Sequence, residues 1–170
     1  MSSQPQPSTN LPLPQYYART LRALLPIFDD TLPLSEDTTQ ATLKSCIDDL
    51  YLISRMLTSL GVFSDNESVE ELGDRELVFM TAAWVLGEAE AKGGLGGPPE
   101  RQAALKRSET AYAAFMQLLA SYRVLGDDAA TGPAAMPADP GARREAKIRA
   151  YKQEKEVRDK ISVSRNFGLA

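Results

Sequence analysis

The stretch SEDTTQATLKSCIDDLYLISRMLTSLG, residues 35–61, decides the fold class of this 170-residue chain. Its apolar side chains recur every three or four residues, which is the period of an α-helix. They form a first stripe of Leu43, Ile47, Leu50, Leu57 and Leu60, and a second stripe of Cys46, Ile53 and Met56. We therefore expect a helix over residues 36–60 that is buried on two sides. Ser35 is its expected N-cap, and Gly61 is expected to end it.

The helical period continues on both sides of this stretch. Further helices are expected over residues 14–25, 75–91, 99–125 and 143–161, with a stop or kink at Pro26, a short turn capped by Ser64 or Asp65, and a cap at Asp74. Their expected core side chains are Tyr16, Tyr17, Leu21, Leu24, Leu25, Leu77, Val78, Met80, Trp84, Val85, Leu105, Tyr112, Phe115, Leu119 and Tyr122. Several alanines over residues 103–114 would allow close helix approach. Because no segment alternates with period two, the sequence predicts an all-α protein of about six or seven antiparallel helices.

The length and the local composition predict the domain organisation. A chain of 170 residues corresponds to one domain with tails. We expect a disordered leader at residues 1–13, a helical domain at 14–162 and a truncated tail at 163–170. Within the domain, the Gly-, Pro- and Ala-rich residues 126–142 are expected to form a mobile loop.

The composition excludes several kinds of active site. The chain has no histidine and one cysteine, Cys46, so it cannot build a His-dependent triad, a His-ligated zinc site or an internal disulfide. We expect Cys46 to be a buried apolar side chain and not a nucleophile. No catalytic residue, metal or cofactor is predicted, and the protein is not expected to be an enzyme. With no apolar run of ~20 residues and no signal peptide, we expect a cytoplasmic protein, with the nucleus also open.

Two other patterns have ordinary explanations. The glycines of residues 93–97 follow a helix and precede two prolines, whereas a phosphate-binding loop needs a preceding strand or a following Lys-Ser/Thr pair. We interpret them as a flexible linker. Adjacent carboxylates such as Asp48-Asp49 point in different directions on a helix and are interpreted as solvated surface.

The charge is divided between two parts of the chain. Residues 1–142 carry 10 basic and 19 acidic side chains, whereas residues 143–170 carry 9 basic and 4 acidic ones. In the last helix, one side is lined by Arg144, Lys147, Tyr151, Lys155 and Arg158. This side is either a solvated surface or a binding surface for an acidic patch on a partner protein. Nucleic acid and membrane are not expected partners, because the chain is acidic overall and the helix has little apolar surface.

Two stretches resemble the alpha-four and Tap forty-two proteins, also called the immunoglobulin-binding protein one family. The first is MLTSLGVFSDNE at residues 56–67, continued by VEEL at 69–72 and RELVFM at 75–80. The second is REAKIRAYKQEKE at residues 144–156, which looks like the family element R-x-x-K-I-x-R-[FY]-K-x-x-K-E. The resemblance spans residues 40–162.

This resemblance implies a fold, a function and a site. Family members have a helical domain similar to tetratricopeptide repeats and to 14-3-3 proteins. They bind the catalytic subunits of type 2A, 4 and 6 protein phosphatases, hold them in a latent form, protect them from degradation and are linked to TOR signalling. The paired basic residues of the family correspond to Arg144 and Lys147, and Tyr151 and Lys155 extend the same side. We expect a monomeric, non-enzymatic regulator and chaperone; the alternative is a general adaptor that binds peptide segments of other proteins.

Overall fold

The computed structural model describes residues 11–64, 67–124 and 139–167. The chain forms two compact units, Met1–Leu125 and Gly126–Ala170, which are considered separately. The expected disordered leader lies outside the described residues except for its last three positions. The expected mobile loop lies outside them up to residue 138, and so do residues 168–170 of the expected tail.

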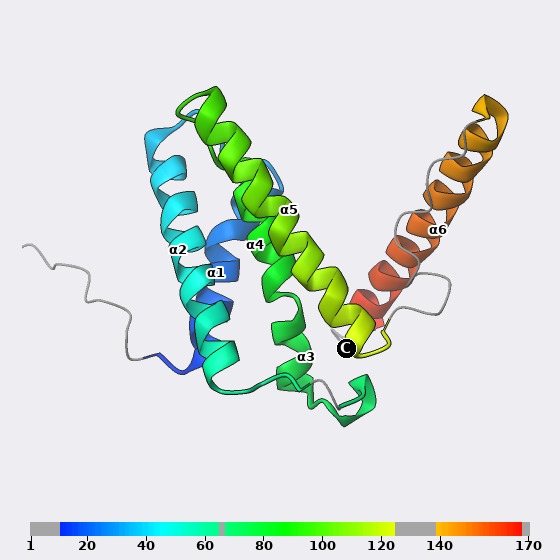
Figure 1. Cartoon of the computed structure of the whole chain (residues 1–170), viewed down its shortest axis with the longest axis horizontal. Coiled ribbons are helices and arrows are strands. Elements are labelled where there is room, and N and C mark those ends of the chain that lie inside the picture. Colours follow the sequence, from blue (N-terminus) through cyan, green and yellow to red (C-terminus); the bar gives the residue numbers. More distant parts are fainter. Residues whose placement is uncertain (1–10, 65–66, 125–138, 168–170) are drawn as a thin grey trace, which may run out of the picture. The chain divides into compact units, whose positions relative to one another are not determined.

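The regular elements among the described residues of the first unit are all helices and include no strand, which confirms the all-α prediction. Its elements are α1 (Leu13–Phe28), α2 (Asp37–Ser59), the 3-10 helix η1 (Val69–Glu71), α3 (Asp74–Met80), α4 (Ala82–Lys92) and α5 (Pro98–Ser121). Helices α1 and α2 pack against each other, as do α4 and α5, and α2 packs on α4 (Figure 1). The result is a stack of two antiparallel hairpins, the arrangement expected for a tetratricopeptide-like domain.

Helix α4 is the centre of this unit because it packs against α1, α2, α3 and α5. Its approach to α5 is close, since Gly87 faces the ring of Tyr112 and the buried residues of α5 are the small Ala104, Ser108 and Ala111. The Ser108 hydroxyl donates a 2.8 Å hydrogen bond to the Gly87 carbonyl. Small side chains therefore set the distance between these two helices.

A core of apolar side chains fills the space between the hairpins. Helix α2 contributes Leu43, Cys46, Leu50, Ile53 and Leu57, and α1 contributes Tyr16, Tyr17, Leu24 and Ile27. The α2 residues follow one another at the predicted spacings of three and four, but they form one stripe that combines members of the two expected ones. Ile47 and Met56 are only partly buried, and Leu60 is exposed. Cys46 is buried as expected, and its burial raises the pKa of the thiol to about 11.

Tyrosine hydroxyls join helices that are distant in the sequence. Tyr16 donates to Asp49 of α2 at 2.6 Å, and the Tyr17 hydroxyl lies 2.8 Å from that of Thr81. Tyr112 of α5 donates to Glu88 of α4 at 2.6 Å. Burial is the largest cause that raises the pKa of Tyr16, Tyr17 and Tyr112 to about 12. Each ring is thus packed in the bundle while its hydroxyl remains satisfied.

The residue that ends α2 was predicted correctly, but the caps were not. Gly61 has φ of +59°, and the amides of Gly61 and Val62 bond to the carbonyls of Thr58 and Leu57, which is a Schellman motif. The N-cap of α2 is Glu36, not Ser35, and its side chain makes no capping bond.

Ahead of η1, the amide of Ser68 donates to the Glu71 carboxylate at 2.6 Å. The expected cap Ser64 instead donates its amide to the Tyr122 hydroxyl, and Asp65 lies outside the described residues.

The prediction of one continuous helix over residues 75–91 is wrong, because the helix is interrupted at Thr81 and divided into α3 and α4. The Thr81 hydroxyl donates a 2.7 Å hydrogen bond to the Val78 carbonyl. The Thr81 amide donates to the same carbonyl at 3.3 Å, three residues back, whereas an α-helix bonds to the carbonyl four residues back. Gly73, not Asp74, is the N-cap of α3. In α1, Pro26 does not stop the helix before Phe28, since a proline in the last turn removes only one intrahelical bond.

Some residues predicted for the core are exposed. They are Leu25, Leu60, Leu77, Val78, Trp84 and Leu105. The sequence pattern favours large apolar side chains, but the α4–α5 crossing is too close for them. Ala89, Ala104 and Ala111 therefore occupy the interior while Trp84 and Leu105 remain at the surface.

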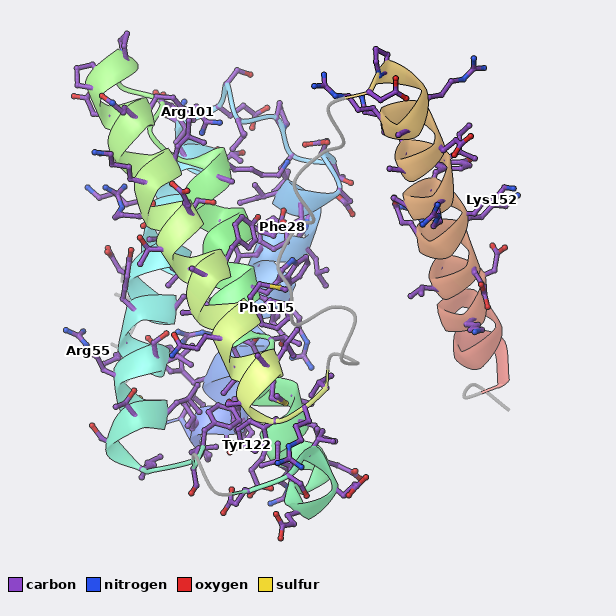
Figure 2. All side chains as sticks on the ribbon, turned by 45° about the vertical axis from the view of Figure 1, so that its right-hand side comes forward. Phe28, Arg55, Arg101, Phe115, Tyr122 and Lys152 are labelled. Atoms are coloured by element: carbon purple, nitrogen blue, oxygen red, sulfur yellow. The ribbon has the colours of Figure 1, made fainter. Side chains whose placement is uncertain are left out.

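The glycine segment between α4 and α5 is not a flexible linker. Arg101 of α5, which is labelled in Figure 2, donates hydrogen bonds to the carbonyl of Ala91 at 2.5 Å and to the carbonyl of Gly93 at 2.8 Å. Gly94 has φ of +72°, and a Cβ there would lie 2.6 Å from the Glu100 carbonyl oxygen. The loop is therefore fixed against α5. Among the described residues, no helix is both long enough and apolar enough to span a bilayer.

We predict that Gly87→Ala destabilises the protein by about 1–2 kcal/mol. Alanine is the better helix former by about 1 kcal/mol, but its Cβ would lie 2.8 Å from the Tyr112 ring and would separate α4 from α5. Urea denaturation measures the effect. As a control, Gly96→Ala makes only ordinary contacts, so the free energy of unfolding should stay constant or rise slightly. A Gly87→Ala protein as stable as the parent would contradict the close packing.

We also predict that stability falls as the pH rises from about 10 to about 12. Burial raises the pKa of Tyr17 from its ordinary value of 10.0 to about 12 in the folded chain, so the unfolded state loses its proton first in this interval. Well below pH 10 Tyr17 is protonated in both the folded and the unfolded state, so it does not change the free energy of unfolding with pH. Urea midpoints at pH 9 and pH 11.5 should therefore differ less in Tyr17→Phe than in the parent. Equal differences in the two proteins would disprove this assignment.

Candidate partner-binding surface

The second unit contains helix α6, Pro140–Phe167. Asp139 precedes it and accepts a 2.8 Å hydrogen bond from the amide of Ala142, so a carboxylate caps the helix. Pro140 suits the first position because it needs no hydrogen bond there. The helix extends beyond residues 143–161 at both ends and includes the first residues of the expected tail.

Four predicted site residues, Arg144, Lys147, Tyr151 and Lys155, form what we call the basic face. They follow one another at spacings of three and four, which places them on one side of α6. All four are exposed, and 67% of the Tyr151 surface is accessible. Together with Ile148 they border a single surface recess. The structure thus brings the predicted site residues together.

The cations of the basic face differ from Arg158 and Lys160, which lie further along α6 and are paired. Within the part of the chain that the structure describes, Arg144, Lys147 and Lys155 form no ion pair. Arg158, which the sequence placed on the same side, is paired with Glu154 at 2.7 Å.

The carboxylates toward the end of the helix are already engaged. Lys160 pairs with Glu156 at 2.8 Å and its hydrogen bond lowers the pKa of that carboxyl. Both this pair and the Glu154–Arg158 pair have the favourable i, i+4 order, with the glutamate nearer the N-terminus. The positive charge of the basic face is therefore available to an acidic partner.

Ile148 is a residue of this surface that the sequence analysis did not select as a site residue. It lies four residues after Arg144 and three before Tyr151, and 45% of its surface is exposed. An isoleucine and a tyrosine among three cations allow apolar contact beside charge pairing. Its helical spacing from Arg144 was the signal that could have identified it.

A second polar cluster lies in the first unit and was missed. Glu90 of α4 is 1% exposed, and its Oε1 accepts 2.8 Å hydrogen bonds from the Tyr51 hydroxyl and from Nε of Arg107. The bond to Glu90 is the largest cause that raises the pKa of Arg107, whereas burial is the largest cause for Tyr51, followed by the Glu90 bond. The cluster joins α2, α4 and α5 through one carboxylate.

The signal for this cluster was the position of Glu90 on α4. Ala82, Val85, Leu86 and Ala89 are the buried apolar residues of that helix, and a charged residue beside them must find partners inside the bundle. The two partners come from helices far away in the sequence, so their identity could not be predicted. No group of three or more potential metal ligands gathers in the described ranges.

Comparison with known proteins adds one finding. The model of the TAP42-like family matches residues 13–167, a range that includes all the helices of both units. A search for similar curated proteins found none.

We predict that Tyr51→Phe lowers the free energy of unfolding by about 1–3 kcal/mol. The substitution removes one of the two donors to a buried carboxylate, and an unsatisfied buried charge costs that much or more. The measurement is chemical denaturation followed by circular dichroism. Tyr151→Phe is the matched control: 67% of this tyrosine is exposed and its hydroxyl bonds to no residue in the described ranges, so the same chemical change should have almost no effect. Equal losses in both variants would refute the role of Tyr51.

Proposed function

Because the chain belongs to the TAP42-like family, we propose that it is a non-enzymatic regulatory subunit for type 2A protein phosphatases. In this proposal it binds the catalytic subunits of types 2A, 4 and 6, holds them in a latent form and protects them from degradation. Its place is the cytoplasm, with a share in the nucleus, and it acts as a monomer linked to TOR signalling.

The observation that carries the proposal is the unpaired positive charge of the basic face. Arg144 can bind a carboxylate through two parallel hydrogen bonds, and Lys147, one turn further on, supplies a second charge. Tyr151 and Ile148 add exposed apolar area beside them. An acidic, partly apolar surface of the catalytic subunit is the partner that this chemistry fits.

The basic face is the place where the proposal can be tested. Arg144→Glu/Lys147→Asp reverses both charges on exposed positions of α6. Removing charges from the buried part of an interface costs about 2–5 kcal/mol, so binding of a purified type 2A catalytic subunit should weaken at least about thirtyfold near 150 mM salt. Pull-down and a binding isotherm measure this loss, while the helical circular dichroism should remain unchanged.

The control is Arg149→Glu/Lys160→Asp, which changes the net charge equally on the opposite side of the same helix. Because it also removes the Lys160–Glu156 pair, its helical circular dichroism must first be shown to equal that of the parent. Binding should stay within a few-fold of the parent. If both double variants bind like the parent, the basic face is not the site. If the parent does not capture the catalytic subunit either, the proposed function fails as a whole, and a general peptide-binding adaptor becomes the better hypothesis.

A further inference from the structure

The six tyrosines of the chain fall into two groups by the state of their hydroxyls. Five belong to the first unit, where each hydroxyl has a hydrogen-bond partner. The pairs are Tyr16 with Asp49, Tyr17 with Thr81, Tyr51 with Glu90, Tyr112 with Glu88 and Tyr122 with the Ser64 amide. The hydroxyl of Tyr151 on α6 bonds to no residue in the described ranges. This tyrosine is also the most exposed, at 67% against 36% for Tyr51.

Lysines flank Tyr151 in both directions along the helix. Lys147 lies four residues before it and Lys155 four residues after it, so both are its neighbours on the same side of α6. Neither lysine forms an ion pair in the part of the chain that the structure describes. The nearest carboxylate along the helix, Glu154, is paired with Arg158 at 2.7 Å. A negatively charged group on the Tyr151 ring would therefore lie beside two lysines that have no counter-ion.

Helix α6 leaves Tyr151 accessible to a modifying enzyme. From Lys147 to Lys160, every side chain that the structure describes is exposed. Most helical stability in proteins comes from the packing of a buried face, so an exposed helix opens locally at little cost. A kinase needs this access, because it must align the acceptor hydroxyl with the γ-phosphate of ATP. The tyrosine hydroxyls of the first unit are instead held by their partners in the bundle.

We propose that Tyr151 is phosphorylated by a tyrosine kinase and that the phosphate blocks the basic face. The phosphoryl donor is ATP. The bond between the γ-phosphorus and the oxygen that bridges it to the β-phosphate breaks, and a bond forms between the γ-phosphorus and Oη of Tyr151. ADP leaves, and the phenol proton passes to the catalytic aspartate of the kinase.

The phosphate changes the charge of the basic face. Arg144, Lys147 and Lys155 contribute three positive charges, and a phosphotyrosine adds about −1.5 to −2 at neutral pH. Its oxygens also accept charge-assisted hydrogen bonds from the lysines one turn away in either direction. A carboxylate of a partner then competes with the phosphate for the same cations. This consequence rests on the proposed function, whereas the modification site does not.

The distribution of phosphate over the six tyrosines tests the modification site. The folded full chain is incubated with Mg²⁺, ATP and each member of a panel of tyrosine kinase catalytic domains, and mass spectrometry quantifies each tyrosine. Tyr151 should receive at least about tenfold more phosphate than Tyr51, whose hydroxyl must first leave Glu90. Equal labelling of the two tyrosines, or no labelling of Tyr151 by any member of the panel, would overturn the proposal.

A ³¹P titration of the phosphorylated chain tests the contact with the lysines. The second pKa of a phosphotyrosine is ordinarily about 6, and an adjacent lysine should lower it. Lys147→Gln should therefore raise this pKa by about 0.2–0.4 pH units. Arg149→Gln is the matched control, because it removes one charge from the opposite side of α6 and should have a smaller effect. Equal effects of the two variants would disprove the lysine contact.

Binding to a purified type 2A catalytic subunit tests the regulatory effect. Phosphorylation should weaken this binding at least about tenfold, since the loss of charge pairing in an interface costs that much or more. Kinase-treated Tyr151→Phe, compared with untreated Tyr151→Phe, should show no such loss. Undiminished binding of the phosphorylated chain would overturn the regulatory effect while the proposed function stands. If the untreated parent captures nothing, the proposed function and the regulatory effect fail together, and the phosphate distribution still decides the modification site.

Discussion

The close approach of α4 and α5 is the constraint on which the first unit depends. Gly87 leaves room for the Tyr112 ring, and Ser108 bonds to the Gly87 carbonyl in the buried crossing. Once this distance is set, α4 lies deep enough to contact α1, α2 and α3 as well. Toward α5 its side chains are small, and the buried carboxylate of Glu90 is bonded through Oε1 by Tyr51 and Arg107.

The two units are held together by different interactions. In the first, apolar burial and tyrosine hydroxyls hold helices together over long sequence distances. In the second, α6 carries exposed charges and is supported locally by its cap and by two i, i+4 pairs. Substitutions on the basic face therefore change exposed charges without removing core packing.

The sequence predicted the features that depend on local chemistry. The period of α2, its end at Gly61, the burial of Cys46 and the shared side of Arg144, Lys147, Tyr151 and Lys155 all follow from residue spacing. It failed where distant segments decide the outcome. The break at Thr81, whose hydroxyl meets Tyr17, and the exposure of Trp84 depend on neighbours that the local pattern does not contain. Glu90 was missed for the same reason, since its partners come from two other helices.

The buried thiol of Cys46 has a practical consequence. It is 4% exposed and its pKa is about 11, so at neutral pH almost no thiolate is present to react with an alkylating dye. It is also the single cysteine of the chain. A second cysteine introduced at an exposed position of α6 would be the sole fast-reacting thiol. A fluorophore could thus be attached there selectively in the otherwise native sequence.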